Sequence, residues 1–201
     1  MADYSDILKR YIPSEAIEIA IRYLKEYKIH LRITKNRNSK LGDFRPPVRS
    51  GVNKVSINYD LNTYAFLITL IHEIAHVHVW ENNGNKPRPH GKEWKSAFRE
   101  LMNPILNKTV FPEDVDFALR KYLRNAKASS GSDVNLSRIL GKYDNSTYIV
   151  LEDLPMNAVF RINNGKTFKK LEKRRTRYMC ICLDDQKNYT ISPLVKVEQI
   201  K

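Results

Sequence analysis

The chain contains 201 residues, of which 42% are hydrophobic and 28% are charged. This balance is typical of a globular protein and excludes wholesale disorder and collagen-like repeats. Lys and Arg number 35 against 22 Asp and Glu, which gives a net charge of +13 and favours a polyanionic partner, most often nucleic acid. A merely solvated basic surface is the alternative explanation of the charge.

Helical spacing of apolar residues in the first two thirds of the chain predicts helices at 14–24, 62–80, 92–102 and 112–124. Alternating apolar residues predict strands at 29–34 and 55–59, and either Asp60 or Asn62 can cap the helix that follows. The segment 35–50 contains Gly and Pro and is expected to be a long loop, as is the polar segment 81–89.

The composition changes at residues 127–133, which read KASSGSD and form the best candidate for a linker. Beyond it the apolar residues alternate with period two in several short runs separated by turn signals. We therefore expect an α+β protein, with one domain at 1–126 and a second at 134–201. The second domain is expected to be a small basic β-barrel or β-sheet.

The composition also bears on the cellular compartment. Two cysteines are too few for a disulfide framework, and the N-terminus has no apolar segment of the kind found in signal peptides. The longest apolar-rich run, 64–80, contains three His and a Glu, which excludes a membrane span. We expect a cytoplasmic protein, free or associated with the nucleoid, with no membrane partner.

The motif His72-Glu73-Ile74-Ala75-His76 lies inside the helix predicted at 62–80. Residues four apart share one helical face, so His72 and His76 are placed to bind one zinc ion. Glu73 then lies beside the metal, where its carboxylate can take a proton from an attacking water and pass it to a leaving amine. Incidental spacing of two His residues is the alternative, but buried imidazoles without partners are costly.

A catalytic zinc ion usually has three protein ligands and one open position. His90 is the favoured third ligand because it begins the next predicted helix, after a loop that can fold back. Glu93 and Glu100 are rival ligands, and Glu93 can instead orient His90. His78 lies about 200° around the helix from His76 and is expected to face away.

Five segments in this order resemble the SprT family, including its Spartan branch: SKLGDFRP at 39–46, VSIN at 55–58, Phe66-Leu67, HEIAH at 72–76 and HGKEW at 90–94. The resemblance covers about residues 15–102. It implies a minimal zincin-like metalloprotease domain in which His72, His76 and His90 hold one catalytic Zn²⁺ and Glu73 is the catalytic acid and base. Eukaryotic relatives cut proteins covalently trapped on DNA and are activated by DNA. Some bacterial relatives carry predicted roles in transcription elongation.

The C-terminal part departs from the family pattern. Many SprT-like proteins end in a zinc ribbon with four Cys, whereas this chain has only Cys180 and Cys182. Two thiolates cannot complete a tetrahedral structural site, so no structural zinc ribbon is expected. Alternation places both Cys on one face of a strand, where we expect them to be buried.

Two basic segments are candidate nucleic-acid contacts. The first lies between 161 and 177 and includes Lys169, Lys170, Lys173, Arg174, Arg175 and Arg177. The second precedes the HExxH helix and includes Arg45 and Arg49. Such segments can follow a phosphate backbone, although solvated faces and protection of edge strands are the alternatives.

Together these features predict a zinc endopeptidase that acts on nucleic-acid-associated proteins, including DNA–protein crosslinks. The expected partner is DNA, either single-stranded or in nucleoprotein. The alternative is a non-proteolytic nucleic-acid-binding or transcription-elongation-associated factor that retains the zinc site. The intact Glu73 favours the peptidase, because a purely structural metal site has no use for a base at that position.

Overall fold

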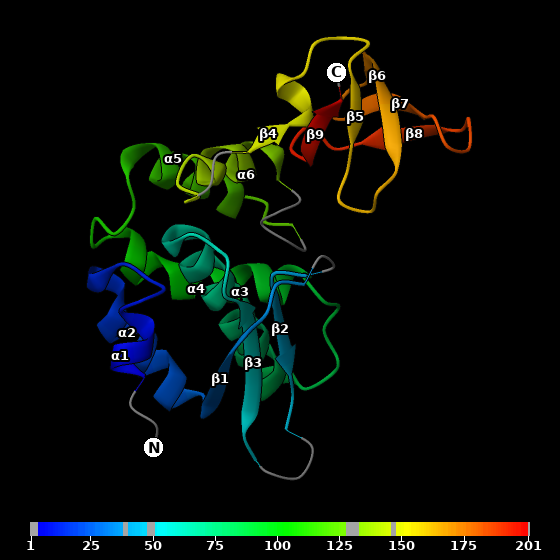
Figure 1. Cartoon of the computed structure of the whole chain (residues 1–201). Helices are drawn as coiled ribbons and strands as arrows, with labels where there is room; N and C mark the ends of the chain where they lie inside the picture. The colour runs from blue at the N-terminus through cyan, green and yellow to red at the C-terminus, as the bar shows by residue number, and fades with distance from the viewer. Residues whose placement is uncertain (1–3, 38–39, 48–50, 128–132, 146–147, 201) are drawn as a thin grey trace. The chain divides into compact units, whose positions relative to one another are not determined.

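A computed structural model describes residues 4–37, 40–47, 51–127, 133–145 and 148–200 (Figure 1). The chain forms two compact units that divide after Asp144. Each unit has its own cluster of buried apolar side chains. Helices and sheets are both present, which confirms the predicted α+β class.

The first unit contains six helices and three strands among its described residues. In chain order they are α1 (Ser5–Leu8), α2 (Ser14–Glu26), β1 (Ile29–Thr34), β2 (Gly42–Arg45), β3 (Asn53–Asn58), α3 (Thr63–Asn83), α4 (Lys92–Leu106), α5 (Glu113–Leu123) and α6 (Val134–Gly141). The four predicted helices and two predicted strands all form, with α3 and α4 extending beyond their predicted ends.

The sheet of the first unit has the strand order β1-β3-β2. Strand β3 pairs in parallel with β1 and antiparallel with β2, which sets Gly42 opposite Ile57 and Phe44 opposite Val55. Strand β2 lies inside the segment predicted to be loop, so that prediction is wrong for these four residues. Gly and Asp are poor strand formers, and the pairing with β3 decides the conformation here.

Helix α3 runs through the core of the first unit. The side chain of Asn62 caps it by accepting a hydrogen bond from the Ala65 N–H at 2.9 Å, which selects one of the two predicted caps. Eleven of its residues are buried, including His72 and Glu73. The helix ends before Gly84, whose φ of 62° an L-residue rarely adopts.

Helix α6 belongs to the first unit, so the division between units does not fall at 127–133 as predicted. Leu136 and Leu140 are buried in the first unit's core. The Asn62 amide donates to the Leu140 carbonyl at 2.9 Å and to the Asp144 carboxylate at 2.7 Å. Of the predicted linker, residues 128–132 lie outside the described residues, and Asp133 caps α6.

The described part of the second unit contains six strands in the order β4-β9-β5-β6-β7-β8. They are β4 (Ile149–Val150), β5 (Val159–Arg161), β6 (Thr167–Lys173), β7 (Tyr178–Cys182), β8 (Asn188–Ile191) and β9 (Lys196–Ile200). All the pairings are antiparallel, and the order leaves two edges, so the unit is an open sheet and not a closed barrel. Cys180 and Cys182 are both buried on one face of β7, as predicted.

No helix among the described residues has the length and the apolar character needed to cross a membrane.

Candidate metal centre

Three histidine side chains meet on the surface of helix α3. His72 and His76 lie one helical turn apart on α3, and His90 precedes helix α4. Nε2 of His90 lies 2.9 Å from Nε2 of His76 and 3.2 Å from Nε2 of His72. One ring nitrogen from each residue therefore converges on a common point, with all three within 4.8 Å of one another.

A tight turn brings His90 back to α3. His90 has a φ of 58°, and the N–H of Gly91 donates to the Arg88 carbonyl at 2.9 Å. A Cβ at Gly91 would lie 2.9 Å from that same carbonyl oxygen, so the turn requires glycine at this position.

Aromatic residues of α4 form one wall of the centre. The ring centroid of Trp94 lies 4.5 Å from that of His72 and 5.0 Å from that of Phe98. The Trp94 indole N–H donates to the backbone carbonyl of His72 at 3.4 Å, and both aromatic rings are buried. This packing holds α4, and with it the turn that carries His90, against α3.

The environment keeps the imidazoles neutral. Burial lowers the pKa of His72 to about 2, and the neighbouring His76 and His90 add to this effect. Burial also lowers the pKa of His76 to about 4 and lowers that of His90. A neutral imidazole keeps a lone pair for a metal ion, so the electrostatics favour ligation.

The donor set fits a metal ion of the zinc type. A tetrahedral site with Zn–N bonds of about 2.0–2.1 Å separates ligand nitrogens by about 3.3–3.4 Å, close to the separations seen here. Three neutral imidazoles suit Zn²⁺ and the neighbouring transition metals and do not suit Mg²⁺ or Ca²⁺. Neither Glu93 nor Glu100 belongs to a three-ligand cluster among the described residues. His78 is instead paired with the hydroxyl of Tyr27 at 2.8 Å.

Glu73 is buried beside the histidine cluster. Burial raises the pKa of its carboxyl to about 8, and the nearby Asp43 adds to this. Arg37, Lys40 and a hydrogen bond from the backbone N–H of Phe44 act in the opposite direction. The side chain packs directly against Gly42, where a Cβ would lie 2.5 Å from Oε1 of Glu73. Sequence reasoning did not single out Gly42 or Phe44 for this role.

The sequence model of the SprT-like family matches residues 9–116, which is more than half of the chain. The chain belongs to the SprT-like family. Among curated proteins, no sequence matches it. The matched region of this SprT-like chain contains Glu73 and the three histidines and ends inside α5, so the second unit lies outside it.

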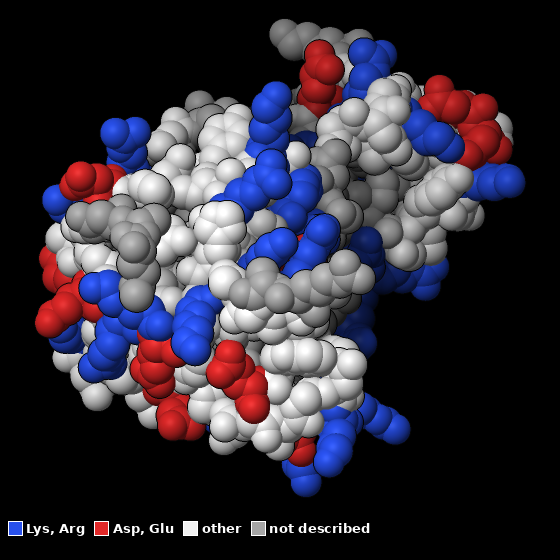
Figure 2. Space-filling model, turned by 90° about the horizontal axis from the view of Figure 1, so that it is seen from below, with Lys and Arg blue, Asp and Glu red and all other residues white. Residues whose placement is uncertain are grey.

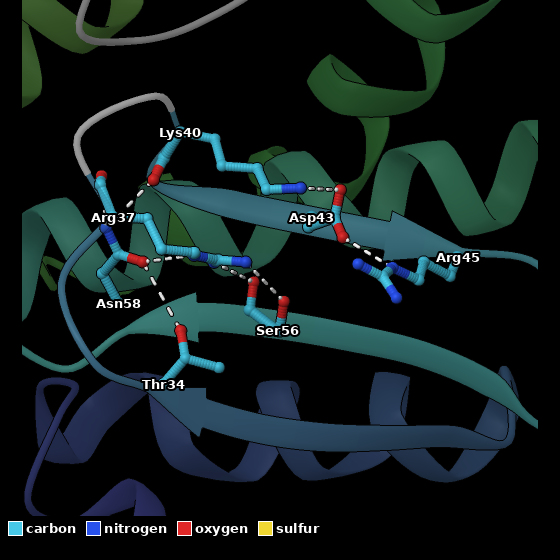
Figure 3. A network of polar contacts seen from close by, with 7 residues as sticks. All are labelled: Thr34, Arg37, Lys40, Asp43, Arg45, Ser56 and Asn58. Atoms are coloured by element: carbon cyan, nitrogen blue, oxygen red, sulfur yellow. Dashed lines mark hydrogen bonds and ion pairs between the residues drawn. The ribbon is translucent and has the colours of Figure 1, made fainter.

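The predicted nucleic-acid contacts of the SprT-like chain fall into different settings. Nε of Arg45 pairs with the Asp43 carboxylate at 2.9 Å, and the Arg45 side chain is 73% exposed (Figure 3). Arg49 lies outside the described residues. Figure 2 shows Lys and Arg side chains close together over part of the face that it draws, with few Asp and Glu side chains among them.

Lys170 is buried, so its prediction as a nucleic-acid contact is wrong. Its ammonium group donates to the carbonyls of Leu151, Glu152 and Leu154 at 2.8, 3.3 and 2.6 Å. It also lies 4.1 Å from the ring centroid of Tyr178. Inward-facing and outward-facing residues alternate along β6, and only the pairing reveals that this lysine points inward. Its neighbour Lys169 is half-buried.

The remaining four predicted contacts, Lys173, Arg174, Arg175 and Arg177, are exposed and lie at the turn between β6 and β7. We call them the basic hairpin. Arg174 pairs with Glu172 at 3.0 Å, and Nε of Arg177 donates to the Thr190 carbonyl at 3.1 Å. The structure thus leaves all four of these sequence-adjacent positive residues exposed.

Proposed function

We propose that this SprT-like chain is a cytoplasmic, zincin-like, zinc-dependent endopeptidase that cuts proteins associated with nucleic acid, including proteins crosslinked to DNA. The observation that carries the proposal is the convergence of three neutral imidazoles beside a buried carboxylate. A metal site with only structural work does not need that carboxylate. Membership of the SprT-like family supports a metalloprotease-like role.

The residues divide the work of peptide hydrolysis. His72, His76 and His90 would hold Zn²⁺, which when bound acts as a Lewis acid toward water and the substrate carbonyl. The carboxylate of Glu73 accepts the proton of the attacking water and delivers it to the departing amine. Trp94 packs α4 against α3 and thereby keeps the imidazole of His90 next to those of His72 and His76.

The basic hairpin supplies the proposed contact with nucleic acid. The second unit carries eleven Lys and Arg and six Asp and Glu, a net charge of +5 over residues 145–201. Exposed guanidinium groups bind phosphates and release counterions, independently of base sequence. Such binding would bring the peptidase to proteins on the same strand, so that selectivity need not come from the cleft.

The test compares zinc-loaded wild type with Glu73→Gln. A basic protein bound to DNA serves as substrate, with and without added single-stranded DNA, and products are followed by gel electrophoresis and mass spectrometry. We expect cleavage by wild type, stimulation by DNA, loss with a chelator, and a rate at least about a hundredfold lower for Glu73→Gln.

A different result would contradict the proposed peptidase activity. Salt-sensitive DNA binding by both proteins with no cleavage by either would contradict the peptidase. That result would instead support a nucleic-acid-binding factor that retains the metal site. Glu73→Gln keeps the shape of the side chain, so a comparable melting temperature of the two proteins shows that folding does not cause the difference.

A further inference from the structure

The start of strand β2 lies unusually close to the side chain of Glu73. A Cβ built at Gly42 would lie 2.5 Å from Oε1, 2.8 Å from Cγ and 2.9 Å from Cδ of Glu73. Real Cβ contacts essentially never come this close, and Glu73 is held in the buried interior. The absence of a side chain at residue 42 is therefore what allows the carboxylate to occupy its position.

The backbone of β2 also acts on the carboxyl group electrostatically. The backbone N–H of Phe44, two residues after Gly42, favours the charged form of Glu73. This effect and the space at Gly42 both depend on the placement of a four-residue edge strand.

A network of polar side chains fixes the segment that leads into β2 (Figure 3). The guanidinium of Arg37 donates to the Asn58 side-chain oxygen at 2.8 Å. It also donates to the hydroxyl and the carbonyl of Ser56 at 3.0 and 3.3 Å. The loop before β2 is thereby fastened across strand β3.

Asn58 fastens the same loop from the other direction. It is 1% exposed, and its amide group donates to the carbonyls of Arg37 and Lys40 at 3.2 and 3.0 Å. Its backbone N–H donates to the Leu41 carbonyl at 2.9 Å, directly before Gly42. Every one of these bonds acts on the chain just upstream of the contact with Glu73.

We propose that Gly42 and Asn58 are positioning residues for Glu73: Asn58 holds the loop that begins β2, and Gly42 leaves the space that sets the direction of the carboxylate. Neither residue belongs to the histidine cluster. This inference rests on the proposed peptidase activity, because it assigns a catalytic consequence to the placement of Glu73.

The main test is Gly42→Ala, with Gly51→Ala as the matched control. The added methyl group at residue 42 must displace Glu73. A Cβ at Gly51 meets nothing within 4 Å, so alanine there strains the backbone at its φ of 65° without touching Glu73. Because misplacement by about 1 Å can cost about a hundredfold in rate, we expect Gly42→Ala to lower kcat by about that factor. KM and bound zinc should stay near the wild-type values, and Gly51→Ala should keep the wild-type kcat.

A second measurement tests the contact without any activity. All three atoms that the new methyl group would meet belong to Glu73, and Glu73→Ala removes them. Gly42→Ala should therefore lower the melting temperature of the wild type and lower it much less in the Glu73→Ala background. Equal shifts in both backgrounds would show that the two residues do not interact and would overturn the inference.

Asn58→Asp tests the fastening of the loop. The change keeps the acceptor for Arg37 and removes both donors to the loop carbonyls. We expect a fall in kcat of about tenfold with unchanged zinc content, whereas the same replacement at the exposed Asn82 of α3 should have no effect. A fall in zinc binding instead of kcat would overturn the positioning role.

Failure of this inference differs visibly from failure of the proposed function. A wild-type protein that cleaves nothing would overturn both. An active wild type accompanied by an equally active Gly42→Ala variant would overturn the positioning role alone.

Discussion

Both units bury ionisable side chains, but they satisfy them in opposite ways. In the first unit, His72, His76 and His90 direct ring nitrogens at one another beside Glu73. In the second unit, Lys170 is more deeply buried, yet its ammonium group donates to three carbonyls and lies over an aromatic ring.

The difference separates a site from a structural support. Neutral imidazoles that point at a common centre share too few protons to satisfy one another, and a bound metal ion would complete them. The lysine has all its donors paired with backbone acceptors and leaves nothing for a ligand. Burial of a charged residue type therefore indicates function only where the surrounding protein leaves its bonding incomplete.

The largest effect is expected from His76→Ala, which tests whether the three histidines of the first unit bind a metal ion. Removing one of three ligands should weaken zinc binding by more than about a hundredfold and abolish cleavage. His78→Ala is the control, because His78 lies on the same helix but is paired with Tyr27. Competition with a zinc-binding dye measures both, and unchanged zinc affinity of His76→Ala would contradict the proposed ligand set.

Lys170→Met tests whether the buried lysine of the second unit has a purely structural role. This change leaves three backbone carbonyls without their donor, so the second unit should lose about 2–3 kcal/mol of stability. Hydrogen exchange of β6 and β7 amides in the full chain measures the loss, and the zinc affinity of the first unit should not change. Lys169→Met, on the opposite face of the strand, should cost less than about 0.5 kcal/mol. Equal effects at the two positions would show that the carbonyl contacts do not matter.

The basic hairpin should contribute to DNA binding where the buried lysine does not. Replacing Lys173, Arg174 and Arg175 by Ala removes three exposed charges from one turn. For single-stranded DNA, the slope of log K against log salt should become shallower by about 2. Three Lys→Ala changes in the first unit match the change in net charge: Lys9, directly after α1, Lys25 in α2 and Lys121 in α5. An equal loss of affinity in that control would indicate a general effect of charge.

A further effect is expected on the stability of the metal-free protein, and it depends on pH. The folded pKa of Glu73 is raised from 4.5 to about 8, so the folded state binds the proton more tightly than the unfolded state. Stability from this group is then fully present below pH 4.5 and is lost as the pH rises through 8. Glu73→Gln cannot ionise, so its melting temperature should rise relative to wild type over that range when both are measured with a chelator. A difference that does not vary with pH would contradict the raised pKa.

The first unit was largely predictable because its signals are local. The helical spacing around His72 and His76 fixes their shared face, and the cap at Asn62 follows from residue type. His90 could be proposed as the third ligand because it follows a loop and opens a helix. No comparable local signal marks β2, because its residues Gly42 and Asp43 favour a turn. Gly42 therefore entered the sequence analysis only as part of the family pattern.

The second unit was less predictable because its pattern is set between strands. Strand β6 contains adjacent lysines at 169 and 170, so residue type alone did not reveal that Lys170 faces inward while Lys169 faces outward. Helix α6 follows a polar segment and has eight residues, too short to give a strong periodic signal. The sequence analysis therefore did not predict this helix and placed the boundary between the units at 127–133. In the structure the first unit extends to Asp144.

The sequence by itself determined the α+β class, the family resemblance, the HExxH helix and the excess of positive charge. These depend on residue types at fixed spacing, which a helix converts directly into geometry. Only the tertiary structure decided that His90 reaches the other imidazoles, that Gly42 makes room for Glu73, and that Lys170 is internal. Each of these joins residues distant in the chain, and the packing of one element on another sets such contacts.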